Sequence, residues 1–154
     1  LLSLVRVLLC VILQLLEQEN NFRFERNSII LGEWYRLFSA NFVHLNVLHM
    51  FMNLTGLVII LYIFTSCLKT IQWLYLIVFS SLFVSTCLFI FNSDIQYYVG
   101  LSGVLHGLFI TGAMIEIRRL PLYGWFLTAT VVFKLLWEQI YGTFSNTEIL
   151  IDVA

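Results

Sequence analysis

The sequence predicts an all-α membrane protein, in which a bundle of transmembrane helices forms one domain over residues 1–154. Six helices are expected, and the sequence ends at the start of the sixth. Hydrophobic residues make up 60% of the chain and charged residues only 11%, and the mean hydropathy is +0.93. A soluble domain of this size needs a charged exterior, so the expected surroundings are a lipid bilayer. In addition, apolar stretches long enough to cross a bilayer as helices recur along the chain.

The first 41 residues divide into two parts. Residues 1–16 are almost entirely apolar and suit the remaining part of a first spanning helix. Residues 17–41 alternate charged residues with aromatic ones, among them Trp34 and Tyr35. Charged side chains are costly in hydrocarbon, whereas aromatic rings anchor a chain at the membrane surface. We therefore expect a folded loop at the interface here, in preference to a solvated linker.

Four further spanning helices are expected at residues 42–65, 71–91, 99–117 and 122–141, and a sixth helix from Glu148 onward. Pro121 marks a stop and restart between the fourth and the fifth. Positive charges are divided almost evenly between the two sides and favour a cytoplasmic start only slightly. The chain begins with Leu, and residues 151–154 resemble the first turn of another helix. We therefore expect it to be a fragment of a longer protein.

The charged and sulfur-containing residues argue against several kinds of function. The net charge of −1 provides no basic surface for nucleic acid. The three cysteines have neither metal-ligand nor disulfide spacing and fit small buried hydrophobes; they are Cys10, Cys67 and Cys87. No metal or organic cofactor is expected. Histidine chemistry must come from the three histidines of the chain or from outside it.

The polar residues of the expected helices fall into one layer. Because successive helices alternate in direction, the starts of the second and fourth and the end of the fifth share one side of the membrane. With a rise of about 1.5 Å per residue, His49 should lie roughly 10 Å below that surface, and Ser102 and Glu138 roughly 5 Å. Ionisable groups at such depths usually face a water-filled cavity or one another. An aqueous pocket is therefore expected on this side.

Ser102 is the candidate nucleophile of this layer. It lies between Gly100 and Gly103, where a polar turn gives way to an apolar helix. Backbone N–H groups at a helix start have no intrahelical partner, so they can hold an oxyanion beside the hydroxyl. The alternative is a structural serine that bonds back to the carbonyl one turn earlier. The Gly-x-Ser-Gly stretch by itself leaves both roles open.

Two pairs of residues could bring other groups to Ser102. His49 and Asn53 are four residues apart and so share a helix face, where they would supply two donors for an oxyanion. Hydrogen bonding between helices is the alternative for this pair. Gly103 and Gly107 permit close approach of a neighbouring helix, which could bring Ser102 within reach of the second helix.

Lys134, Glu138 and His106 are the remaining ionisable residues of this layer. Lys134 and Glu138 are four residues apart on the fifth helix and are expected to pair with each other rather than to contact a substrate. His106 lies on the same helix face as Ser102. As a base, however, it would need the serine hydroxyl to point along the helix axis, away from an incoming substrate carbonyl.

Taken together, these residues resemble the rhomboid family of intramembrane serine proteases. Residues 100–103 resemble the family's Gly-x-Ser-Gly, and the run His-Leu-Asn-Val-Leu-His-Met-Phe-Met-Asn at 44–53 is similar to its second-helix pattern. Residues 32–36 resemble the Gly-Glu-x-Trp-Arg of its first loop, with Tyr35 in place of the usual Trp. More narrowly, residues 98–107 and the pair Trp137-Glu138 look like the rhombosortase branch.

The resemblance implies a six-helix rhomboid-like bundle and a serine endopeptidase with Ser102 as nucleophile. The oxyanion would be bound by the backbone N–H groups of Leu101 and Ser102 and by the side chains of His49 and Asn53. Supporting positions next to these groups would be Gly100, Gly103, His106 and His44. The general base is a sixth-helix histidine, expected just beyond Ala154. The sequence therefore lacks half of the Ser-His dyad, and by itself it is expected to be inactive.

The family also implies partners and a location. Its substrates are single-span membrane proteins within the lipid bilayer, and the rhombosortase branch implies Gly-Gly-containing C-terminal sorting segments of bacterial secreted proteins. The expected location is the bacterial inner membrane, as a multi-pass protein, with water entering from the non-cytoplasmic side. Two rival readings stay open: a rhomboid-like scaffold or chaperone that binds transmembrane helices without cleaving them, and a transporter fragment. The off-centre polar layer counts against a transporter.

Overall fold

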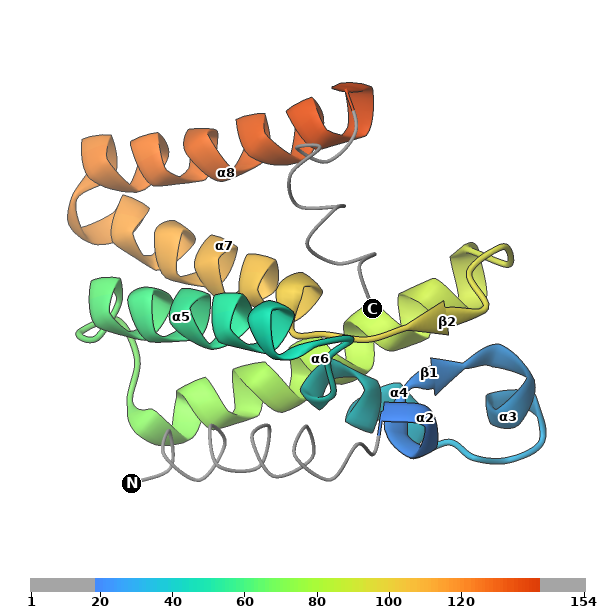
Figure 1. The fold of residues 1–154 in the computed structure, drawn as a ribbon. Coiled ribbons are helices and arrows are strands. Elements are labelled where there is room, and N and C mark those ends of the chain that lie inside the picture. The colour runs from blue at the N-terminus through green and yellow to red at the C-terminus, as the bar shows by residue number, and fades with distance from the viewer. Residues whose placement is uncertain (1–18, 142–154) are drawn as a thin grey trace.

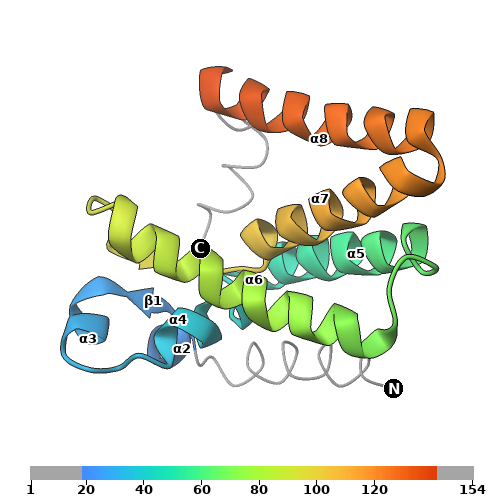
Figure 2. The same ribbon diagram turned by 180° about the vertical axis from the view of Figure 1, so that it is seen from behind.

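The structure is a computed structural model that describes residues 19–141. In chain order the elements are α2 (Glu19–Phe22), β1 (Phe24–Glu25), α3 (Arg26–Ile30), α4 (Arg36–Ser39), η1 (Ala40–Phe42), α5 (Val47–Ile63), α6 (Thr70–Phe91), β2 (Tyr97–Tyr98), α7 (Ser102–Arg119) and α8 (Pro121–Tyr141). Figures 1 and 2 show four long helices, with α7 between α8 on one side and α5 and α6 on the other, and with the short N-terminal elements gathered at one end beside the second half of α6. The predicted all-α class is confirmed.

The helix bounds agree with the prediction where apolar runs have sharp edges. The third and fifth predicted helices correspond to α6 and α8 within one residue at each end. α7 begins at Ser102 instead of residue 99, because Gly100 has a φ of +106°. Glycine alone adopts that conformation without strain, so the chain turns there before the helix starts.

The predicted start of the second helix at residue 42 was wrong. Asn46 is extended, with a φ of −152°, and its side-chain oxygen accepts a hydrogen bond from the backbone N–H of His49 at 2.7 Å. This N-cap starts α5 at Val47. His44 therefore lies before the helix, and His49 lies in its first turn instead of roughly 10 Å along it.

The loop before α5 is folded, as predicted, over the residues that the structure describes. Arg26 donates hydrogen bonds to four carbonyl oxygens at and just beyond the end of α6, those of Leu88, Phe89, Asn92 and Ile95. β1 pairs antiparallel with β2, with Phe24 opposite Tyr98 and Glu25 opposite Tyr97. This two-residue pairing was not predicted. It ties the N-terminal loop to the segment that leads into Ser102.

The main core lies between α5, α6 and α7, with α8 added from one side. Its fully buried side chains include Phe64, Val104 and Leu108. The predicted close approach at Gly103 and Gly107 is present, but the neighbouring helix is α6 and not α5. A Cβ at Gly103 would lie 2.9 Å from Cγ1 of Val84, and one at Gly107 would lie 3.2 Å from Oγ of Ser80. Toward α5 the small residue is Gly56, where a Cβ would lie 3.0 Å from Cδ1 of Leu105.

Among the described helices, α6 alone is long and apolar enough to cross a membrane, and the pair formed by residues 36–42 and α5, bent by 92°, meets the same criteria when taken together. Large apolar side chains are exposed on the long helices, as at Phe51, Phe79 and Trp125, which suits contact with lipid. The six-helix bundle stays a prediction, since the expected first and sixth helices lie outside the described residues.

Candidate active site

Ser102 is the first residue of α7 and is exposed. The loop before it is held in place, because the N–H of Gly100 donates to the carbonyl oxygen of Ala40 at 3.0 Å. Leu101, which caps the helix, is buried. No helical turn precedes Ser102, so the structural role of bonding back within a helix does not apply to it. Its own N–H and those of the next residues have no acceptor within the helix. The Tyr98 hydroxyl accepts hydrogen bonds from the side chain of Ser102 and from the backbone N–H of Gly103.

A cavity of about 500 Å³ opens beside Ser102. Its lining comes from the loop before β1, the segment around the start of α5, the region of β2, and the start of α7; the residues are Arg23, Leu45, His49, Tyr97, Tyr98, Val99 and Ser102. Ser102 and His49, which are 53 positions apart in the sequence, therefore face the same cavity. This arrangement agrees with a pocket on the side where α5 and α7 begin.

Gly100 brings the loop before Ser102 into contact with both predicted oxyanion side chains. A Cβ at this position would lie 2.8 Å from Cε1 and 3.0 Å from Nε2 of His49, and 3.7 Å from Nδ2 of Asn53. Any side chain at Gly100 would collide with the imidazole. Asn53 donates one amide hydrogen to the carbonyl of His49 at 3.1 Å within α5, which leaves its second amide hydrogen for another acceptor.

His44 packs against the imidazole ring of His49. It is fully buried, and its ring meets that of His49 edge to face with the centroids 5.2 Å apart. Both ring nitrogens of His44 and Nδ1 of His49 are buried without a hydrogen-bond partner among the described residues. Buried polar atoms normally find partners, so unpaired ones mark a place where packing alone does not explain the residue choice.

His106 is directed along α7 and toward α8. Its Nδ1 lies 2.8 Å from the carbonyl oxygen of Ser102, and since a carbonyl only accepts, Nδ1 donates and Nε2 is the acceptor. Nζ of Lys134 lies 3.2 Å from Nε2. Lys134 also bonds Glu138 at 2.9 Å, so the predicted pairing of these two residues is confirmed. His106 thus bonds the backbone of Ser102, and its contact with Lys134 was not predicted.

The sequence missed Arg23, Tyr97 and Tyr98 as cavity residues. Tyr98 donates its hydroxyl hydrogen to the carbonyl of Gly100 at 3.0 Å, and the guanidinium of Arg23 lies 4.3 Å from the centre of the Tyr97 ring. The contact of Arg23 with Tyr97 joins the segments that pair as β1 and β2, whereas the hydrogen bond of Tyr98 is local to its own segment. The only sequence signal was the mixture of charged and aromatic residues, which does not say which aromatics meet which charges.

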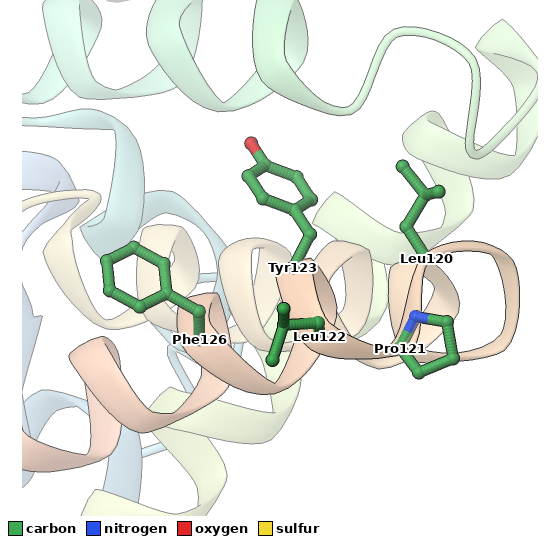
Figure 3. A pocket seen from close by; sticks show the side chains of 5 residues that line it. All are labelled: Leu120, Pro121, Leu122, Tyr123 and Phe126. Atoms are coloured by element: carbon green, nitrogen blue, oxygen red, sulfur yellow. The ribbon is translucent and has the colours of Figure 1, made fainter.

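A second hollow, of about 660 Å³, lies at the other end of α7. Figure 3 shows its lining around the turn into α8, formed by Leu120, Pro121, Leu122, Tyr123 and Phe126. This lining is apolar apart from the tyrosine hydroxyl and contains no acid-base pair, so it offers no chemistry of its own. Within residues 19–141, no three His, Cys, Asp or Glu side chains are grouped so as to hold a metal ion.

The general base predicted beyond Ala154 lies outside the described residues, as do residues 142–154 themselves. What the structure does bring together is a serine at a helix start and the two side chains predicted to bind an oxyanion.

The model of the Rhomboid domain family matches residues 31–153, which is most of the chain. A comparison with curated proteins gave no match. A family match of this extent, over the segment that contains Ser102, His49 and Asn53, shows the family. The chain therefore belongs to the rhomboid family of intramembrane serine proteases, which are integral membrane proteins and act on transmembrane substrates.

Proposed function

We propose that this protein, in its intact form, is an intramembrane serine endopeptidase with Ser102 as its nucleophile. The observation that carries the proposal is the shared cavity: Ser102 and His49 line it together, and Gly100 packs against both His49 and Asn53. A nucleophile next to preorganised hydrogen-bond donors is the arrangement that acyl transfer requires.

In the proposed reaction, Oγ of Ser102 attacks the carbonyl carbon of a peptide bond in a substrate helix that unwinds at the cavity. The proton of the hydroxyl passes to a histidine of the sixth helix, expected beyond Ala154, and from there to the leaving amine. Water then hydrolyses the acyl-enzyme and restores the serine. The chain itself contributes the nucleophile and the oxyanion site, and the histidine would complete the dyad.

The negative charge of the tetrahedral intermediate falls on the former carbonyl oxygen. We assign its stabilisation to the backbone N–H groups of Ser102 and Leu101 and to the side chains of His49 and Asn53. The capping bond from Asn46 and the packing of His44 fix the first turn of α5 before any substrate arrives. Such fixed donors stabilise a transition state without the cost of reorganising at the moment of reaction.

The narrower proposal is a rhombosortase-like specificity. It is supported by the resemblance of residues 98–107 and of Trp137-Glu138 to that branch. The substrates would be single-span proteins with Gly-Gly-containing C-terminal sorting segments, and the protein would be a multi-pass component of the bacterial inner membrane. A model substrate with Gly-Gly should then be cleaved faster than the same substrate with Leu-Leu, and equal rates would rule out this specificity.

Fluorophosphonate labelling of the full-length protein in membranes tests the nucleophile directly. The intact protein should be labelled and should cleave a single-span substrate, whereas Ser102→Ala should do neither. Ser93→Ala is a matched control, because Ser93 is an exposed loop serine whose hydroxyl bonds only the neighbouring Asp94 among the described residues. Cleavage by Ser102→Ala would overturn the proposal. Substrate binding without cleavage by the unmodified protein would favour the scaffold.

A further inference from the structure

The three arginines within the described residues 19–42 make different contacts. Arg26 makes four hydrogen bonds to backbone carbonyls. Arg36 bonds the carboxylate of Glu33 and the carbonyl oxygens of Asn20 and Arg23. The Nε of Arg23, in contrast, is buried without a hydrogen-bond partner among the described residues. Two of these arginines hold the loop together through hydrogen bonds, whereas the side chain of Arg23 has only the ion pair with Glu25 in the described part of this loop.

Arg23 is also the one of the three that lines the cavity beside Ser102. Its guanidinium lies against the ring of Tyr97, another cavity residue, at 4.3 Å from the ring centre. Its backbone is fixed as well, because Arg36 bonds its carbonyl oxygen at 3.0 Å. The side chain remains 26% exposed. A guanidinium held by stacking keeps its planar set of donors oriented, so less conformational entropy is lost when it binds a ligand.

The carboxylates nearby form no hydrogen bond with Arg23 among the described residues. Glu25 is its ion-pair partner, but the Glu25 oxygen lies 3.8 Å from Nε of Arg23 and is shared with Nη1 of Arg36 at 4.0 Å, and both distances are too long for a hydrogen bond. Glu33 belongs to Arg36: hydrogen bonds from Arg36 and from Tyr35 lower the pKa of Glu33 and keep it ionised. No Asp or Glu is among the residues that line the cavity.

We propose that Arg23 determines specificity by binding a carboxylate of the substrate in the cavity next to the cleaved bond. The proposal rests on the proposed protease function and adds to it the chemistry of the substrate: an Asp or Glu in the segment that enters beside Ser102. A charge-assisted, bidentate bond from guanidinium to carboxylate is the strongest contact that this site offers. The apolar and aromatic walls around it reduce competition from water.

A charge exchange between enzyme and substrate tests this inference. The full-length enzyme in phosphatidylcholine vesicles is given single-span model substrates. At each position flanking the cleaved bond, three substrates are compared that differ only in having Asp, Asn or Lys there. At one position, kcat/KM should be about tenfold higher for Asp than for Asn, as expected for one charge-assisted contact worth roughly one factor of ten. Arg23→Glu should reverse the order and favour Lys.

Two further variants separate binding from folding. Arg23→Gln should lose the preference for Asp without gaining one for Lys, and Arg23→Lys should retain part of it. Arg118→Glu makes the same charge change at the exposed far end of α7 and should leave the order of substrates unchanged. The inference is overturned if Arg23→Glu and the unmodified enzyme rank the three substrates alike.

Photocrosslinking of the same substrates distinguishes a failure of this inference from a failure of the proposed protease function. If the unmodified enzyme cleaves none of them, the proposed function fails. Crosslinking to Ser102→Ala, with and without Arg23→Glu, still shows whether the acidic substrate is preferred. A charge effect that appears only in vesicles containing phosphatidylglycerol would assign Arg23 to a lipid phosphate and overturn the proposal.

Discussion

The two ends of α7 both lie among polar residues. At one end the polar side chains are hydrogen-bonded to one another, and at the other end several buried nitrogens are not. At the Glu116 end, the buried carboxylate of Glu116 accepts hydrogen bonds from Sγ of Cys67 at 3.0 Å and from Arg119 at 3.1 Å, and Arg119 also reaches Oγ of Ser66 at 3.3 Å. At the Ser102 end, buried nitrogens of His44 and His49 have no partner among the described residues. One end is a closed network and the other is open.

This contrast separates stability from chemistry within one helix. The hydrogen bonds around the buried Glu116 carboxylate hold the segment between α5 and α6 against the end of α7, and they occupy the groups that could otherwise meet a substrate. Unpaired polar atoms around an accessible serine lower stability, and they are retained where binding or catalysis uses them. Changes at the Ser102 end should therefore alter turnover, and changes at the Glu116 end should not.

The largest effect is expected for Gly100→Ala. The new Cβ would meet the His49 imidazole at 2.8 Å and displace it, whereas Asn53 at 3.7 Å would stay in ordinary contact. Loss of the His49 position should lower kcat/KM on the order of 10³-fold. Gly32→Ala is the matched control, because Gly32 has nearly the same φ of +108° but no atom within 4 Å of an added Cβ. Both variants carry a left-handed strain of about 1–2 kcal/mol. Equal losses of activity would show that strain, and not the contact with His49, is responsible.

A smaller effect is expected for Asn53→Ala. If Asn53 binds only the oxyanion, kcat should fall about 10²-fold while KM changes little, because the contact forms in the transition state. Thr55→Ala removes a comparable bond within α5, from Oγ1 to the carbonyl of Phe51 at 2.8 Å, at an exposed position. Its steady-state kinetics should match those of the unmodified enzyme. A rise in KM alone for Asn53→Ala would place this residue in substrate binding instead.

The sequence was most informative where a single local rule decides the structure. The bounds of α6 and α8 followed from long apolar runs with polar edges. The start of α5 did not, because an N-cap at Asn46 outweighs the apolar character of residues 42 and 43. Helical depth counted from residue 42 therefore placed His49 too far along its helix.

The candidate site shows the same division. Ser102, His49 and Asn53 could be found because each belongs to a short motif and the alternating helices bring the motifs to one side. Arg23 could not be found in this way. Its position depends on pairing between Glu25 and Tyr97, which are 72 residues apart, and a two-residue strand carries no periodic signal of its own. The sequence likewise left open which helix packs on Gly103 and Gly107, because their spacing predicts a close approach but does not identify the neighbouring helix.

The smallest effect is expected at the closed end, for Glu116→Gln. Burial and the Glu116 carboxylate raise the pKa of the Cys67 thiol to about 11, whereas Arg119 acts in the opposite direction. Without the carboxylate charge, the thiolate of Cys67 is repelled less, so the pKa of Cys67 should fall. Its alkylation by iodoacetamide at pH 8 should then become several-fold faster. The rate is measured with Cys10→Ser and Cys87→Ser, so that Cys67 is the only thiol of the chain. Substrate cleavage should be unchanged in the same protein. A slower alkylation would contradict the assigned role of Glu116, and a parallel loss of cleavage would break the separation between the two ends of α7.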